Sequence, residues 1–410
     1  MDLSRLTLEI FSKLEQKWLS EPIYSPASKP KTRILTIDGG MERDGMVAAE
    51  ALVHLETQIK VQTGNPNARI TDHFHLIAGT GLGGVLALLL TAPLLSATEA
   101  RDFLMSNLAN LFRRDNAGRF FRLQRSGSFS GKSFSKTLRA VFNNMTLRDT
   151  CKPVLVPCYD LNSSAPFVFS RADASQSLSF DFDLVDVCRA TSASPGVFKP
   201  CGVVSVDKKT RCVGLSGGLV MNNPAAAAIT HVMHNKRDFP DVGGVEDLAL
   251  LSIGNGRDKS DGGDFVGCIK SNLAMEIVFR GVSDTVDQIL TNAFSWNPTN
   301  YIRIQTNGLT TEEGASKAID EKRRGGETPE ELRKSGERML SEIGVESLPF
   351  GGKRLLKETN GERIETFVRG LVVASTRIVA NSVEPLLLLP PPSPSWEEVN
   401  SGVTLLADGR

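Results

Sequence analysis

The chain has 410 residues, and its 47 basic side chains balance 47 acidic ones, so the formal net charge is zero. This balance excludes a general electrostatic affinity for nucleic acid, and the length allows one large domain or two small ones. The six cysteines form no C-x-x-C pair and the five histidines lie in no metal-ligand pattern, so we expect reduced thiols, no metal and no cofactor.

The apolar spacing and the prolines of residues 1–31 predict an amphipathic helix followed by a linker. Three prolines lie within residues 21–31, and no basic region precedes an apolar stretch, so we expect no signal peptide. The longest apolar run, Val85–Leu95, is shorter than the roughly 20 residues that span a bilayer. We therefore expect a cytoplasmic protein that contacts membranes only peripherally. The helical stripe, which we interpret as a face that docks onto the domain, consists of Leu3, Leu6, Ile10, Phe11, Leu14 and Trp18.

Residues 32–307 alternate apolar strands with helices, which predicts an α/β domain with a mainly parallel sheet. The strands are expected at Arg33–Ile37, Phe74–Ala78, Pro153–Tyr159, Phe167–Ser170 and Leu248–Ile253, and helices at Met46–Ile59, Ala97–Leu111, Gly131–Phe142 and Ala225–Met233. Residues 308–390 begin with a charged, glycine-rich insertion at Thr310–Gly336 and continue as a helical part, and residues 391–410 form a proline-rich tail.

A glycine-rich turn follows the second predicted strand. Gly79, Thr80, Gly81, Leu82 and Gly83 stand between the apolar runs of a strand and a helix. In serine hydrolases, a G-x-S-x-G segment at such a turn exposes a nucleophilic serine on a sharp elbow. Here the central residue is glycine, which has no nucleophile.

Three further segments predict a common site with this elbow. Asp38, Gly39 and Gly40 follow the first strand, where backbone N–H groups can converge on an anion. Cys188–Pro195 is rich in small residues, and Gly214–Pro224 is a turn that opens a helix.

In order and spacing, the four segments resemble the patatin-like phospholipases over residues 32–307, and most closely the plant group III members. The family hydrolyses acyl esters of phospholipids and galactolipids with a Ser–Asp dyad. The resemblance implies a three-layer sandwich around a mainly parallel sheet. It also implies that acyl lipids or membrane lipids, bound peripherally, are the partners and that nucleic acid is not; the sequence does not identify a protein partner.

The sequence departs from the family pattern at each part of the site. Gly81 stands at the nucleophile position and Ser216 at the acid position, so no catalytic residue of the dyad is intact. Ser216 has too high a pKa to act as a base near neutral pH. In the anion turn Asp38, Gly39, Gly40 and Arg43 match, whereas Met41 and Asp44 replace glycines and Gly45 comes one residue late; Gly79, Thr80, Gly83 and Gly84 complete the elbow.

We therefore expect a hydrolase scaffold that binds lipid or regulates lipid metabolism without hydrolysis. One alternative is a weak acyl hydrolase with a non-standard site, for which Thr80, Ser216, Cys188, His73 and His75 are the conceivable groups. A lesser alternative is dinucleotide binding, because Gly79, Gly81 and Gly84 satisfy G-x-G-x-x-G, with Glu99 or Asp102 at the spacing of the ribose-binding acid.

A locally basic stretch, Arg113–Arg139, predicts contact with an anionic lipid surface. The alternative is a solvated helix face with some aromatic residues in the core. The lipid-surface candidates are Arg113, Arg114, Arg119, Arg122 and Arg125, and the interleaved aromatics are Phe112, Phe120, Phe121, Phe129 and Phe134.

Overall fold

The computed structural model describes residues 30–40, 42–113, 129–254, 271–307, 328–348 and 352–387, and for 42–44, 271–276 and 374–387 it describes the backbone alone. The predicted N-terminal helix, most of the basic stretch, residues 310–327 of the charged insertion and the proline-rich tail lie outside these residues. The rest of the predicted insertion, 328–336, is not a solvated loop, because it begins a helix in which Leu332 and Gly336 are buried.

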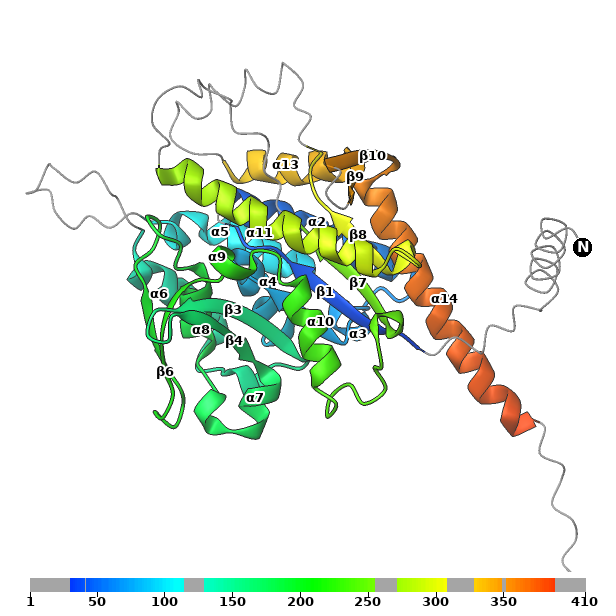
Figure 1. Ribbon diagram of the computed structural model, residues 1–410, viewed down its shortest axis with the longest axis horizontal. Helices are drawn as coiled ribbons and strands as arrows, with labels where there is room; N and C mark the ends of the chain where they lie inside the picture. Colours follow the sequence, from blue (N-terminus) through cyan, green and yellow to red (C-terminus); the bar gives the residue numbers. More distant parts are fainter. Residues whose placement is uncertain are drawn as a thin grey trace, which may run out of the picture.

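The strands form one mainly parallel sheet and a separate hairpin (Figure 1). The order across the sheet is β5-β6-β3-β2-β1-β7-β8, with β4 paired to β3. Strands β1, β2, β3, β7 and β8 run parallel, and β4 and β6 pair antiparallel to β3. The bounds are β1 Thr32–Ile37, β2 Leu76–Gly79, β3 Val154–Asp160, β4 Ala165–Ser170, β5 Cys201–Val204, β6 Arg211–Ser216, β7 Leu248–Ile253 and β8 Tyr301–Ile304, with the hairpin β9 Ile343–Leu348 and β10 Gly352–Thr359.

Helices cover both faces of the sheet, which makes the predicted three-layer sandwich (Figure 1). The helices are α2 Glu42–Thr63, α3 Ile70–His73, α4 Gly81–Thr91, α5 Ala97–Leu111, α6 Gly131–Phe142, α7 Arg171–Gln176, α8 Leu184–Ser192, α9 Gly218–Met221, α10 Ala225–His234, α11 Ser271–Ala293, α13 Pro329–Ser341 and α14 Asn360–Leu387. Within the described ranges, none of these helices is both long enough and apolar enough to cross a bilayer.

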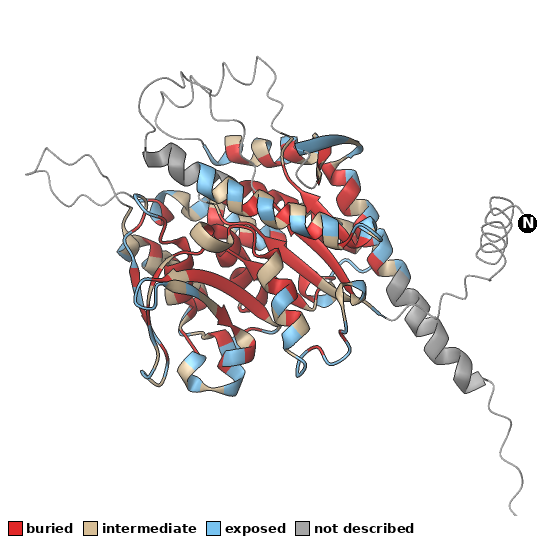
Figure 2. Ribbon diagram, in the orientation of Figure 1, coloured by how far each residue is buried: buried red, intermediate tan, exposed pale blue. Residues whose placement is uncertain are grey.

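Successive side chains of a strand point to opposite sides of the sheet, so the continuous apolar runs of the central strands make both faces apolar. In β1, Leu35 and Ile37 join the core beneath α2, α4 and α5, whereas Ile34 joins the core beneath α10 and α11. Strands β2, β7 and β8 are accordingly buried throughout, and β1 is buried from Ile34 onward (Figure 2). The α/β fold and its mainly parallel sheet, predicted from the apolar runs, are confirmed.

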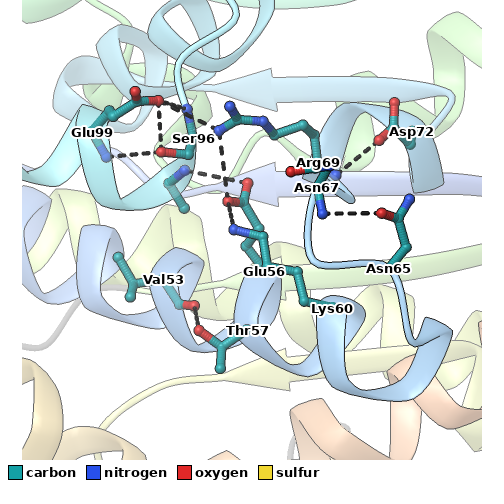
Figure 3. A network of polar contacts seen from close by, with 11 residues as sticks. Val53, Glu56, Thr57, Lys60, Asn65, Asn67, Arg69, Asp72, Ser96 and Glu99 are labelled. Carbon is teal, nitrogen blue, oxygen red and sulfur yellow. Dashed lines mark hydrogen bonds and ion pairs between the residues drawn. The ribbon is translucent and has the colours of Figure 1, made fainter.

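A buried carboxylate fixes the helices behind the sheet. Glu56 on α2 lies within 2.9 Å of Lys60 Nζ and accepts from the N–H of Ala97 at the start of α5 (Figure 3). Arg69, which precedes α3, lies 4.0 Å from Glu56 and 3.4 Å from Glu99. This network joins α2, α3 and α5, and therefore holds the layer against which α4 packs.

Candidate functional site

The elbow between β2 and α4 is a sharp turn. Thr80 is extended (φ −119°, ψ 146°), and Gly81 enters α4 with φ +54°, in the left-handed region that favours glycine. A Cβ on residue 81 would lie 3.1 Å from the carbonyl oxygen of Gly40 and 3.2 Å from its nitrogen. The elbow conformation is therefore present, and its apex faces the backbone of the anion turn without a side chain.

The other glycines of the elbow are required by close backbone contacts. A Cβ on Gly79 would lie 2.1 Å from the oxygen of Gly83, and a Cβ on Gly83 would lie 2.5 Å from the oxygen of Asp38. Gly45 likewise has no room for a side chain, because its Cβ would meet Leu82 at 2.5 Å. These contacts lock the elbow against the segment that follows β1.

Two threonine hydroxyls connect the elbow to its neighbours. Thr191, at the end of α8, accepts from the N–H of Gly81 at 3.0 Å and donates to the carbonyl of Pro157 at 2.7 Å. Thr80 is fully buried and donates its hydroxyl to the carbonyl of Met221 at 2.7 Å. Both hydroxyls therefore stabilise the turn, and neither faces a base.

Two backbone N–H groups of the anion turn already donate to carbonyl oxygens of the protein. The N–H of Asp38 donates to Ile253 O at 2.9 Å, and the N–H of Gly39 donates to Asn222 O at 2.8 Å. The Gly39 donor is thus occupied by protein. Met41 and the side chains of Arg43 and Asp44 lie outside the described residues.

Ser216 ends β6 and is buried beside the elbow. Its Oγ accepts from the N–H of Gly218 at 3.2 Å, so it caps the turn into α9. A Cβ on the adjacent Gly217 would lie 3.1 Å from the methyl group of Thr80. The four segments singled out in the sequence thus converge at the ends of β1, β2 and β6.

A buried ion pair holds Asp38, the first residue of the anion turn. Asp38 accepts from both terminal nitrogens of Arg303 at 2.7 and 2.5 Å and from the hydroxyl of Ser283 at 2.8 Å. Burial alone would lower the pKa of the Arg303 guanidinium, but the Asp38 carboxylate outweighs burial and raises it. Burial raises the pKa of the Asp38 carboxyl, whereas Arg303 and Ser283 act to lower it. The pair joins β1, β8 and α11.

Comparisons with known proteins agree with this geometry. A family model described as patatin-like phospholipase matches residues 35–229. The chain is 50% identical to "Probable inactive patatin-like protein 9" of Arabidopsis thaliana, with 100% of both chains covered. It is 41% identical to "Patatin-like protein 7" of the same plant, covering 92% of this chain and 82% of that one. It is 40% identical to "Patatin-like protein 3" of Oryza sativa subsp. indica, covering 90% of each.

The chain belongs to the patatin-like phospholipase family. The resemblance stated from the motifs is thereby confirmed. Within this patatin-like fold, the two positions expected to carry the dyad hold Gly81 and Ser216. They adjoin Thr80 and Gly217, which lie so close together that a Cβ on Gly217 would be 3.1 Å from the Thr80 methyl group.

The other candidate nucleophiles and bases do not assemble a substitute for the patatin-like dyad. Burial raises the pKa of the Cys188 thiol well above its ordinary value, so it stays protonated. His75 precedes β2 and accepts from the N–H of Arg33 at 2.9 Å. It therefore lies where β2 starts, whereas the elbow lies where β2 ends. His73 ends α3, on the same side as His75.

The structure does not support dinucleotide binding, because neither candidate for the ribose-binding acid lies where the fingerprint requires it. Glu99 lies in the first turn of α5, where its carboxylate accepts from the N–H and hydroxyl of Ser96, both at 2.7 Å (Figure 3). Asp102 follows on the same helix. The fingerprint requires its acid at the end of a second strand, so neither residue can bind a ribose in that manner.

The basic stretch is only partly described. Arg113 is exposed, and Arg114, Arg119, Arg122 and Arg125 lie outside the described residues. Phe112 packs against Phe129 with ring centroids 5.5 Å apart, and Phe134 packs against Phe198 at 5.1 Å. Phe112 and Phe134 are buried in the core and Phe129 packs against it, as in the alternative interpretation of this stretch. Contact of the stretch with lipid stays a prediction.

Two supporting residues escaped the sequence prediction. Arg303 and Asn222 hold the anion turn through a side chain and a carbonyl, respectively, and Asn222 lies inside a segment already singled out. Arg303 lies in a short strand with no motif around it. No spacing signal links it to Asp38, 265 positions earlier.

Proposed function

We propose that this protein is a patatin-like lipid acyl hydrolase scaffold that binds acyl lipid, or regulates lipid metabolism, without hydrolysing esters. The observation that carries the proposal is Gly81, which holds the elbow conformation with no nucleophile. Ser216 supports it, since a hydroxyl engaged by the N–H of Gly218 replaces the general base. The name of the half-identical Arabidopsis relative, a probable inactive patatin-like protein, agrees with this proposal.

A mostly apolar cavity near the elbow, lined also by Ser170, Asp173, Thr230 and His231, supports the lipid-binding half of the proposal. It has a volume of about 500 Å³. Met221, whose carbonyl accepts the Thr80 hydroxyl, lines it. The Asn223 side chain is almost fully buried in its wall, and within the described part of the chain its Nδ2 has no hydrogen-bond partner. An acyl chain with a carbonyl oxygen suits such a cavity. The apolar wall includes Leu155, Val168, Val220, Ala226, Ala227 and Val286.

The test has an activity arm and a binding arm. A fluorophosphonate probe should leave Ile77–Val85 unlabelled, and phospholipid, galactolipid and monoacyl-lipid substrates should stay intact. A fluorescent fatty acid should bind, and Ala227→Phe, which fills the cavity, should weaken its binding. Gly281→Phe is the matched control, because a Cβ on Gly281 meets nothing within 4 Å and Gly281 does not line this cavity. Stoichiometric labelling of the elbow would refute the loss of catalysis, and binding unchanged by Ala227→Phe would refute the assigned cavity.

A further inference from the structure

A second cavity opens at the β8 edge of the sheet, away from the elbow. Its volume is about 860 Å³, and we call it the edge groove. It lies between β8, the hairpin, the end of α11 and one face of α14 (Figure 1). Its apolar wall includes Phe294, Tyr301, Ile302, Leu356, Phe367 and Leu371.

The α14 side of the edge groove combines three buried residues, Arg363, Phe367 and Leu371, with the exposed positions Thr366 and Gly370. The lining residues of α14 begin with Arg363 and follow it by three, four, seven and eight positions. This spacing places them on one side of the helix. Thr366 and Gly370 are exposed, and a Cβ on Gly370 would meet nothing within 4 Å. Val373, one turn beyond Gly370, is 46% exposed. The lining residues are Arg363, Thr366, Phe367, Gly370 and Leu371.

We propose that the edge groove receives the amphipathic N-terminal segment of this chain, residues 3–18, packed as a helix against α14. The described chain begins in the groove itself, because Pro30 and Lys31 line it. Residues 19–29 reach at most about 40 Å when extended, and a helix over residues 3–18 is about 24 Å long. The start of β1 and α14 lie side by side at this edge (Figure 1).

The chemistry of the groove favours this helix over an acyl anion. The apolar stripe of residues 3–18 has the spacing that packs against a face such as that of α14. Three of the four arginines of the wall are already engaged by the protein: Arg303 with Asp38 at 2.5 Å, Arg354 with Glu346 at 2.6 Å, and Arg363 with the carbonyl of Arg303 at 2.6 Å. Large apolar side chains are also exposed next to the lining residues, with Trp296 at 59% and Leu355 at 51%. A docked amphipathic helix would cover such apolar surface.

The test uses Trp18 as a reporter in the full chain. In Trp296→Phe/Trp396→Phe, Trp18 is the remaining tryptophan of the three. We expect its emission to be blue-shifted and its acrylamide quenching to be weak. Adding Gly370→Phe blocks the groove and should give a red-shifted Trp18 with several-fold stronger quenching. Gly281→Phe adds the same bulk on α11, outside the lining of the groove, and should leave Trp18 shielded.

A second pair of variants separates docking from misfolding. Ile10→Asp places a charge on the stripe and should expose Trp18, whereas Ser12→Asp on the opposite face should not. Neither changes the groove wall, and circular dichroism checks the fold of every variant. The proposal is overturned if Trp18 is solvent-exposed in the parent, or if its shielding survives Gly370→Phe. It is also overturned if shielding needs added fatty acid, or if it disappears on dilution, which would assign the groove to lipid or to a second copy.

Discussion

Gly81 adopts the conformation of a nucleophile elbow but supplies no nucleophile. A serine at this position would adopt the same positive φ (+54°) at a cost of about 1–2 kcal/mol, and its Cβ would lie beside the Gly40 backbone. The turn therefore has the shape that a nucleophile needs. The missing parts are the hydroxyl at position 81 and a carboxylate at position 216.

Restoring the dyad should require both changes. Gly81→Ser alone should hydrolyse a short-chain p-nitrophenyl ester about as slowly as the parent, because neither Thr191 nor Ser216 can act as its base. Gly81→Ser/Ser216→Asp should be faster by about 10²-fold, the lower range of a general-base contribution. Met41→Gly should add a further gain if that side chain misplaces the oxyanion donors, and deletion of Asp44 is the alternative change to the same turn. If the single variant equals the double variant, Ser216 does not occupy the acid position.

The residues of the site were predictable from sequence to different degrees. Gly79 and Gly83 carry a pattern because close backbone contacts demand glycine there, and Gly81 adopts a positive φ that favours glycine. Arg303 could not be found in this way, since a buried ion pair between distant strands has no fixed spacing. Thr191 was included only as a small residue, and its hydrogen bond to Gly81 depends on how α8 packs.

At the scale of elements, the strands and helices of the parallel core follow directly from their apolar runs. The C-terminal part was harder to predict, because α13 and α14 carry many charged residues and the expectation for residues 308–390 began with a solvated insertion. In the structure Met339 on α13 and Ile364 on α14 are fully buried against the core. A narrow apolar stripe among charged residues thus decides the packing.

His75, which precedes β2 and accepts from the N–H of Arg33 in β1, should make the free energy of unfolding depend on pH. Burial, with the nearby charges of Arg33 and Lys152, lowers the pKa of His75 to about 4. The unfolded chain binds this proton near pH 6.5, so the folded state loses stability as the pH falls from about 6.5 towards 4. His75→Asn keeps an acceptor for the Arg33 N–H and removes the titration. Its urea midpoint should therefore fall less than that of the parent between pH 7.5 and 4.5. His234→Asn, at an exposed position, is the control, and equal slopes for His75→Asn and the parent would contradict the assignment.

At the scale of the whole molecule, zero net charge leaves membrane attraction to local patches. The aromatics Phe112, Phe129 and Phe134 are committed to the core, so any lipid contact of the basic stretch depends on its arginines. Such contact is electrostatic and should be more sensitive to salt than an inserted aromatic surface would be. This difference makes ionic strength the informative variable.

We therefore predict that the protein binds anionic vesicles at low salt and releases them at high salt. The Debye length falls from about 30 Å at 0.01 M to about 3 Å at 1 M, so screening should remove most of the attraction in a vesicle sedimentation assay. Arg119→Glu/Arg122→Glu should weaken low-salt binding, because each reversal turns an attraction of about 1 kcal/mol into a repulsion. Arg237→Glu/Lys334→Glu makes the same change in net charge at exposed positions elsewhere and should bind as the parent does. Equal binding to neutral vesicles at every salt concentration would show that the basic stretch does not recognise lipid charge. Equal losses in both double variants would show that net charge, rather than this stretch, controls the attraction.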